Sequence, residues 1–196
     1  WSETKEERVF RIACLFRPGP ARGEIVALTG HLAENELRGG LTFIERALGI
    51  EKAREFYEQE SGQALSQSEL ARRLTADGYP VPQSHISRMN DAVRYLLPAI
   101  PTLLYGGLGR HQVDRLAVLR KACERTWERR ALGRPLTVDF ASLFQDVLSQ
   151  FDTQPEGFSP QRVQDELVGQ MAELLEADYD TLALEVDDSE SRQRVL

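Results

Sequence analysis

The strongest constraint on the fold is the spacing of the apolar residues, which follows a helical period over most of the chain. Leucine, isoleucine and valine recur every three or four residues, so that each segment carries one apolar face. This spacing predicts helices over 24–37, 42–57, 66–76, 82–97, 110–130, 138–151 and 160–175. The single predicted strand is Val9–Phe16, a short apolar run that ends in a proline-rich turn. We therefore expect a mainly α chain with one N-terminal strand and a helical C-terminal segment.

Capping residues mark the expected helix starts. Thr42 and Ser66 are each followed three residues later by a glutamate, Glu45 and Glu69, which is the spacing of a capping box. Pro82 suits the first turn of a helix, where its missing N–H group is not needed. These signals favour three separate helices within residues 42–97.

The composition is that of an ordinary globular protein of 196 residues, with 41% hydrophobic and 28% charged side chains. No apolar run approaches the ~20 residues that a membrane-spanning helix needs, so we expect a cytoplasmic protein without a membrane partner. Cys14 and Cys123 are too far apart for a metal or redox motif, which fits a reducing compartment. The chain begins with Trp1, and we interpret it as a fragment of a longer protein.

The charges are unevenly distributed along the chain. Residues 61–130 carry 11 Lys and Arg against 6 Asp and Glu, whereas residues 131–196 carry 4 against 14. Phosphate binding depends on the local density of cations, so the middle third favours a nucleic-acid partner despite a net charge of −7. Residues 178–196 form an acidic tail that we expect to be partly disordered.

Residues 65–97 have the pattern of a helix-turn-helix. Two short helices are joined by a turn, and Ala71 on the first is small enough for a close crossing. The turn from Leu74 to Val81 is longer than in the tightest such motifs, which leaves the crossing angle open. The second helix begins with polar side chains that suit base edges, and its free N–H groups suit a phosphate. The predicted DNA-binding residues are Gln83, Ser84, His85, Ser87 and Arg88 on the second helix, with Arg72 and Arg73 on the first. A plain helical hairpin with a polar outer face is the alternative.

Two segments resemble ParB-type partition proteins. The stretch LSQSELARRL…VPQSHISRM, followed by LLPAIPTLLYGGLGRHQVDRLAVL, resembles the central DNA-binding domain of that family. Upstream, ENELRGGL at 34–41, followed by Ile44-Glu45, resembles the family's Glu-Asn-x-x-Arg-x-x-Leu…Ile-Glu motif. The matches occur in the family's order, cover about residues 8–122, and lie nearest to the ParB-like proteins of integrating conjugative elements.

The resemblance implies a DNA-binding protein that acts in the partition or maintenance of a plasmid or other mobile element. It implies double-stranded DNA, a ParA-type ATPase and a second copy of the chain as partners, on the nucleoid or the element. It further implies Glu34 and Asn35 as metal and triphosphate ligands and Arg38 as a phosphate contact, with CTP and Mg²⁺ bound by the full-length protein. The family's glycine- and arginine-containing phosphate motif is absent here, so we predict no cofactor for this fragment. On the residues alone, Glu34 and Asn35 also fit a polar pair at a helix end.

These observations divide the chain into four parts. We predict the end of a ParB-like N-terminal domain with connecting helices over 1–60, a helix-turn-helix domain over 61–132, a helical segment over 133–177 and the acidic tail over 178–196.

The sequence contains no pattern for a metal or catalytic site, because its histidines lack ligand spacing and no G-x-S-x-G motif occurs. Two alternatives to DNA binding remain. One is a protein-binding helical adaptor, favoured by the acidic residues 131–196. The other is a CTP-hydrolysing clamp when full length.

Overall fold

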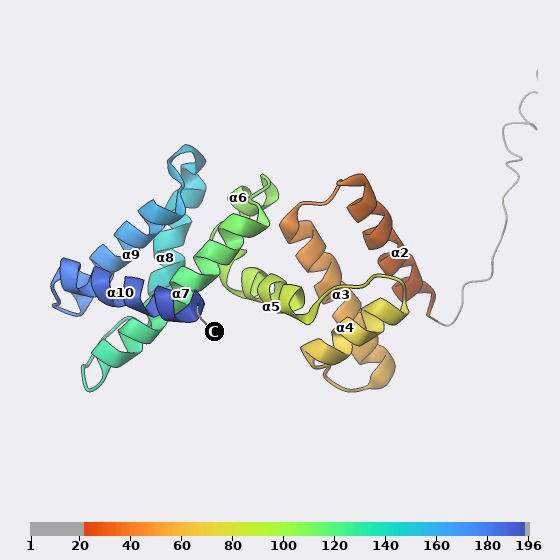
Figure 1. The fold of residues 1–196 in the computed structure, drawn as a ribbon, viewed down its shortest axis with the longest axis horizontal. Helices are drawn as coiled ribbons and strands as arrows, with labels where there is room; N and C mark the ends of the chain where they lie inside the picture. The colour runs from red at the N-terminus through yellow and green to blue at the C-terminus, as the bar shows by residue number, and fades with distance from the viewer. Residues whose placement is uncertain (1–21, 195–196) are drawn as a thin grey trace, which may run out of the picture.

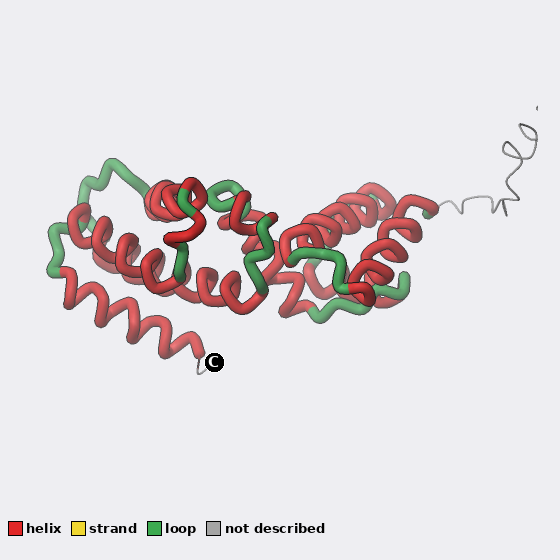
Figure 2. Tube along the Cα trace, turned by 90° about the horizontal axis from the view of Figure 1, so that it is seen from above, coloured by secondary structure: helices red, strands yellow, loops and turns green. Residues whose placement is uncertain are grey.

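The computed structural model describes residues 22–194 as a series of helices joined by short turns (Figures 1 and 2). In chain order these are α2 Gly23–Arg38, α3 Phe43–Ser61, α4 Gln67–Ala76, α5 Gln83–Asp91, the π-helical η1 Ala92–Leu96, α6 Pro101–Tyr105, α7 Arg110–Ala131, α8 Phe140–Thr153, the 3₁₀ turn η2 Pro155–Gly157, α9 Pro160–Leu174 and α10 Tyr179–Arg194. The predicted mainly α class is confirmed. The predicted strand Val9–Phe16 lies outside the described residues, and residues 22–194 contain no strand. No helix in this part of the chain is long and apolar enough to cross a membrane.

The helices form two groups, with η1 and α6 between them (Figure 1). In the N-terminal group, α2, α4 and α5 pack against α3, which buries Ile44, Ala47 and Ile50. In the C-terminal group, α8, α9 and α10 surround α7. The two groups adjoin where α5 packs on α7 and where η1 packs on α8. The predicted motif over 65–97 therefore rests on α3, which is earlier in the sequence.

The start of α3 carries the predicted capping box. The Glu45 N–H donates to Thr42 Oγ1 at 3.3 Å, and the Thr42 N–H donates to the Glu45 carboxylate at 2.8 Å. At the start of α4, Ser66 Oγ accepts the Glu69 N–H, but the Glu69 carboxylate binds Arg72 and Arg73. Two guanidinium groups offer charge-assisted bonds that are stronger than a bond to a neutral backbone N–H. The Glu69 carboxylate therefore binds the arginines and not the Ser66 N–H, and only the Ser66 side of the capping box forms. The two arginines also lower the pKa of Glu69 to about 2.

Helix α5 continues into a π turn. The Leu97 N–H donates to the carbonyl of Ala92, five residues earlier, at 2.9 Å. The predicted helix over 82–97 is therefore α-helical only as far as Asp91 and is wider over Ala92–Leu96.

The prediction of a partly disordered acidic tail is wrong for the residues described. Tyr179–Arg194 form α10, which packs along α7. Leu182 and Val186 stand four residues apart and are fully buried on this contact. Glu185 forms ion pairs with Arg129 and Arg130 of α7. The prediction considered only the number of acidic residues. It did not include the burial of Leu182 and Val186 or the ion pairs with the basic end of α7, which offset the charge repulsion within α10.

Candidate nucleic-acid interface

Helices α4 and α5 form a packed pair on α3. Leu70 and Leu74 of α4 and Ile86 of α5 are fully buried, and Met89 lies beside them. The hydrophobic effect therefore fixes the inner faces of both helices and leaves their polar faces outward.

The turn over 77–82 is long but firmly held. Tyr79 and Val81 are buried within it, and burial raises the pKa of Tyr79 to about 12. Arg46 Nε donates to the Tyr79 hydroxyl oxygen at 2.8 Å, and the Tyr57 hydroxyl donates to Asp77 Oδ2 at 2.6 Å. The turn before α5 is thus anchored to α3 through two of its side chains, Asp77 and Tyr79.

The first turn of α5 presents polar side chains that form no hydrogen bond within residues 22–194. Gln83 and Ser84 are exposed, and Pro82 supplies no side-chain cap for the helix N–H groups. This turn contains no acidic residue, in contrast to the first turns of α2, α3 and α4. By helical spacing Ser87, which is half-buried, shares the outer face.

The predicted residues His85 and Arg88 lie on a different side of α5. Both line a cavity shared with α3 and α7, and Arg88 Nε lies 3.5 Å from Asp114 of α7. The structure therefore separates the predicted set on α5 into an outer row, Gln83, Ser84 and Ser87, and a flank.

The two arginines predicted on α4 are both held by acidic neighbours. Arg72, with a side chain 68% exposed, binds Glu69 through two nitrogens at 2.7 and 2.8 Å. Arg73 is 23% exposed and binds Glu69 and Glu60, with its guanidinium 5.7 Å from the centre of the Tyr57 ring. Arg73 therefore joins α4 to α3, whereas Arg72 remains at the surface.

One exposed arginine on the outer side of α5 and η1 was not predicted. Arg94 belongs to η1, follows Ser87 by seven residues and is exposed. Its guanidinium lies 5.2 Å from the ring centre of Tyr95. Arg94 lies within the π turn over Ala92–Leu96, which the sequence did not predict.

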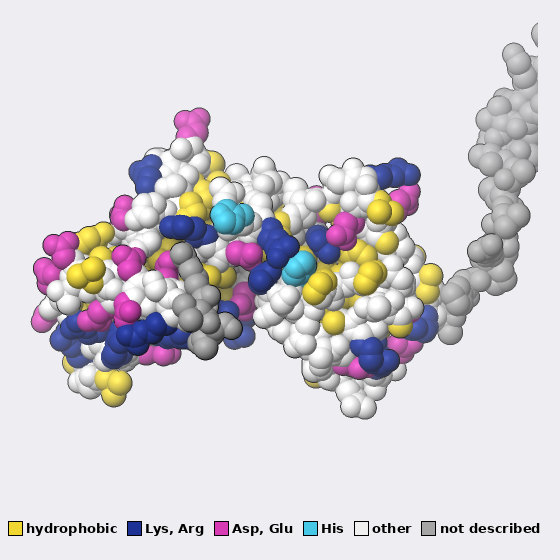
Figure 3. All heavy atoms as spheres, in the orientation of Figure 1, with side chains coloured by type: hydrophobic (Ala, Val, Ile, Leu, Met, Phe, Trp, Pro, Cys, Tyr) yellow, Lys and Arg dark blue, Asp and Glu magenta, His cyan; other side chains and the backbone are white. Residues whose placement is uncertain are grey.

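A second unpredicted feature is a cavity of about 210 Å³ between α3, α5 and α7, which we name the arginine pocket. Its lining is Leu41, Thr42, Phe43, Arg46, His85, Arg88, Met89 and Arg110. Figure 3 shows basic side chains and a histidine gathered at the middle of this face, where the two groups of helices adjoin. The cations come from three helices that are far apart in sequence.

Positive charge exceeds negative charge around the arginine pocket. Arg88 and Arg110 share one carboxylate, Asp114, at 3.5 and 3.7 Å, and Arg46 pairs with Glu36 at 3.0 Å. The pKa of His85 lies below its ordinary value of 6.5 because of burial and the nearby Arg110, Arg88 and Arg46. Three guanidinium groups therefore face two carboxylates, beside an imidazole whose protonation is disfavoured.

The residues that the ParB resemblance implies for a nucleotide lie on α2. Glu34 and Arg38 form an ion pair at 2.6 Å, and the Asn35 amide donates to the His31 carbonyl at 2.9 Å. All of these contacts are within one helix, and Glu34 and Arg38 are exposed. Within residues 22–194 no group of His, Cys, Asp and Glu side chains could hold a metal ion.

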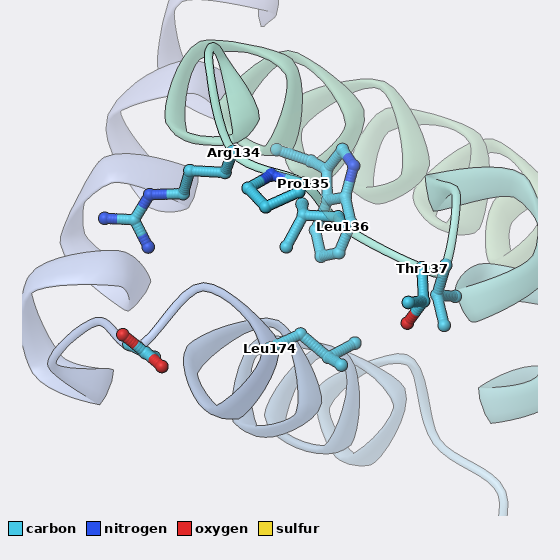
Figure 4. Close-up of a pocket in the computed structure, with 8 residues that line it drawn as sticks. Arg134, Pro135, Leu136, Thr137 and Leu174 are labelled. Carbon is cyan, nitrogen blue, oxygen red and sulfur yellow. The ribbon is translucent and has the colours of Figure 1, made fainter.

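A larger cavity of about 410 Å³ lies in the C-terminal group (Figure 4). Arg134 and Thr137 stand at its two ends, and Leu174 of α9 forms the opposite wall. The Arg134 guanidinium donates to the backbone carbonyl of Leu175, which holds the loop before α8. With one arginine, one glutamate and an apolar middle, this cavity suits an apolar side chain better than a phosphate.

Comparison of the chain with protein-family models, with curated proteins and with solved structures gives no match. The function therefore has to be argued from the site itself.

Proposed function

We propose that the chain binds double-stranded DNA, with α4 and α5 acting as a helix-turn-helix and α5 as the recognition helix. The first turn of α5 carries the proposal, because Gln83 and Ser84 are exposed there, the helix N–H groups have no side-chain cap, and no acid is present. A helix start of this kind attracts phosphate. The burial of Tyr79 and Val81 supports it further, since it orders the longer turn.

The outer row of α5 has suitable chemistry for the major groove. An α-helix with its side chains is about 10–12 Å across, which fits a major groove about 12 Å wide. Gln83 can pair with adenine, and Ser84 and Ser87 can donate to a base edge or a phosphate. Arg94, seven residues beyond Ser87 and exposed, would neutralise a backbone phosphate.

The ParB resemblance extends the proposal to partition or maintenance of a plasmid or mobile element. In that role the chain would act as a homodimer with a ParA-type ATPase, and the full-length protein would bind CTP and Mg²⁺. Glu34, Asn35 and Arg38 would contribute to that nucleotide site, which requires the Glu34–Arg38 ion pair to open.

The test is fluorescence anisotropy of a labelled random duplex titrated with the chain over a range of salt concentrations. We expect log affinity to fall linearly with log salt, by about 0.9 per phosphate neutralised. Arg94→Ala should weaken binding and reduce the slope by about one. The control Arg162→Ala removes the same charge from α9, in the C-terminal group, and should bind as the wild type does. Absence of salt-dependent binding, or equal loss in both variants, would contradict the proposal.

A protein-binding adaptor is the second candidate, favoured by the cavity beside Leu174, whose middle is apolar. In that case Leu174→Asp would abolish capture of a protein partner, and Arg94→Ala would leave it unchanged. Under the DNA-binding proposal, Arg94→Ala lowers the affinity for duplex DNA and Leu174→Asp leaves it unchanged.

A further inference from the structure

We propose that the arginine pocket is a binding site for a phosphate group, supplied either by the DNA backbone or by a free phosphate compound. Only the DNA source rests on the proposed function. The phosphate chemistry rests on the pocket alone.

Convergence of guanidinium groups is the first observation. Arg46 of α3, Arg88 of α5 and Arg110 of α7 line one cavity. Guanidinium groups bind phosphate oxygens in pairs of parallel hydrogen bonds, and several around one cavity can share a single anion. The three helices hold these side chains in place before a ligand arrives.

Unused donor capacity is the second observation. The contacts of Arg88 and Arg110 with Asp114 are 3.5 and 3.7 Å, longer than the 2.7–2.9 Å typical of charge-assisted bonds. Arg88 Nη1 is buried and has no hydrogen-bond partner among the described residues. A buried donor without an acceptor costs free energy. Asp114 Oδ1 beside it is also buried without a hydrogen-bond partner among the described residues, so a bound anion competes with this carboxylate for the guanidinium.

The apolar part of the lining is the third observation. Leu41, Phe43 and Met89 form a wall next to the cations. Such a wall lowers the local dielectric constant and so strengthens attraction between the guanidinium groups and an anion. It also offers a surface for the carbon atoms of a phosphate ester.

The pocket lies beside the proposed recognition helix. His85 and Arg88 belong to α5, one to five residues beyond the exposed Gln83 and Ser84. A DNA phosphate held here would set the position of α5 along the duplex, since backbone contacts position a protein and base contacts specify the sequence. Because Arg110 belongs to α7, the same ligand would join the two groups of helices.

The first experiment titrates the full chain with inorganic pyrophosphate and follows the His85 imidazole by NMR, assigned with His85→Gln. We expect a saturable shift of the His85 signals. Arg110→Gln should weaken binding by about tenfold, the effect of one charge-assisted bond. Arg110 has a side chain 54% exposed, so the fold should tolerate the change. The matched control is Arg115→Gln, an exposed arginine of α7 outside the pocket lining, which should bind as the wild type does.

The second experiment repeats the salt-dependent duplex titration with the same two variants. If DNA supplies the phosphate, Arg110→Gln lowers the affinity and reduces the salt slope by about one, and pyrophosphate competes with the duplex. If only pyrophosphate binds, the pocket takes a free phosphate compound, and the proposed DNA-binding function fails while the site stands. If DNA binds but neither ligand shifts His85, and both variants behave alike, the phosphate site is overturned while DNA binding stands.

Discussion

Individual arginines differ in how far acidic and aromatic neighbours already occupy their guanidinium groups. Arg73 binds Glu69 and Glu60 and lies against the Tyr57 ring, whereas within residues 22–194 the Arg94 guanidinium contacts only the Tyr95 ring. The sequence placed Arg73 among the DNA-binding candidates and omitted Arg94. A side chain's ionic partners come from packing between helices, which the order of residues does not reveal. The position of Arg94 depends likewise on the π turn over Ala92–Leu96, which the sequence did not reveal.

His85 predicts a pH dependence of phosphate binding. Burial and the facing Arg46, Arg88 and Arg110 lower its pKa, and Asp114 opposes them less strongly. A bound anion favours the protonated imidazole and therefore raises the pKa of His85. The affinity for the anion should then increase as the pH falls toward this pKa and decrease as the pH rises above it. Between about pH 7.5 and about pH 5.5, wild-type affinity for duplex DNA or pyrophosphate should therefore increase more than that of His85→Gln. Parallel pH profiles for the two proteins would rule this out.

The hydroxyl group of Tyr57 should contribute to the stability of the fold. The ring is fully buried and its hydroxyl donates to Asp77, which also binds Arg22. Tyr57→Phe keeps the packing but removes a hydrogen bond to a charged group, so the free energy of unfolding should fall by about 1–2 kcal/mol in urea. Tyr105→Phe, at an exposed residue, should leave it unchanged. Equal stabilities of the two variants would contradict the assigned role of the Tyr57 hydroxyl.

At the scale of the elements, local signals placed the helices well. The starts at Thr42 and Ser66 were predicted from their polar caps, and both side chains accept the expected N–H groups. The predictions were wrong where contacts between helices determine the local structure. Glu69 binds arginines instead of completing its box, and α10 forms because α7 covers its apolar stripe.

The two caps predict unequal effects of alanine substitution. Thr42→Ala removes one side of a complete capping box, whereas Ser66→Ala removes a single cap bond. We expect losses of about 1–2 kcal/mol for Thr42→Ala and about 0.5–1 kcal/mol for Ser66→Ala in thermal or urea unfolding. The reverse order would show that the Glu45 contact adds nothing.

At the scale of the molecule, α7 links the two groups of helices. Arg110, at its start, lines the arginine pocket, and Arg129 and Arg130, near its end, bind α10. The sequence predicted α7 closely, but it could not show that Arg46 and Arg110 line one cavity, because that depends on how α3, α5 and α7 pack. The arginine pocket therefore could not be predicted from the sequence alone.

The packing of α10 on α7 predicts the reactivity of Cys123. This thiol is buried, and burial raises its pKa, so it should react with a disulfide reagent only when α10 opens. In a Cys14→Ser background, Val186→Ala should accelerate labelling by about tenfold, because a core truncation of this kind costs about 1–2 kcal/mol. Leu184→Ala, 70% exposed on the same helix, should label at the parental rate. Equal rates in both variants would show that α10 does not control access.

The π turn at Ala92–Leu96 bears on the evolution of chain length. A turn closed over five residues accommodates one residue more than an α-helical turn, so a one-codon insertion can be absorbed without breaking the helix. A homologue one residue shorter could therefore keep both Ile86 and Ile100 buried, provided that the deletion falls within 92–96. When such chains are aligned, the gap belongs inside this turn and not in the loops on either side.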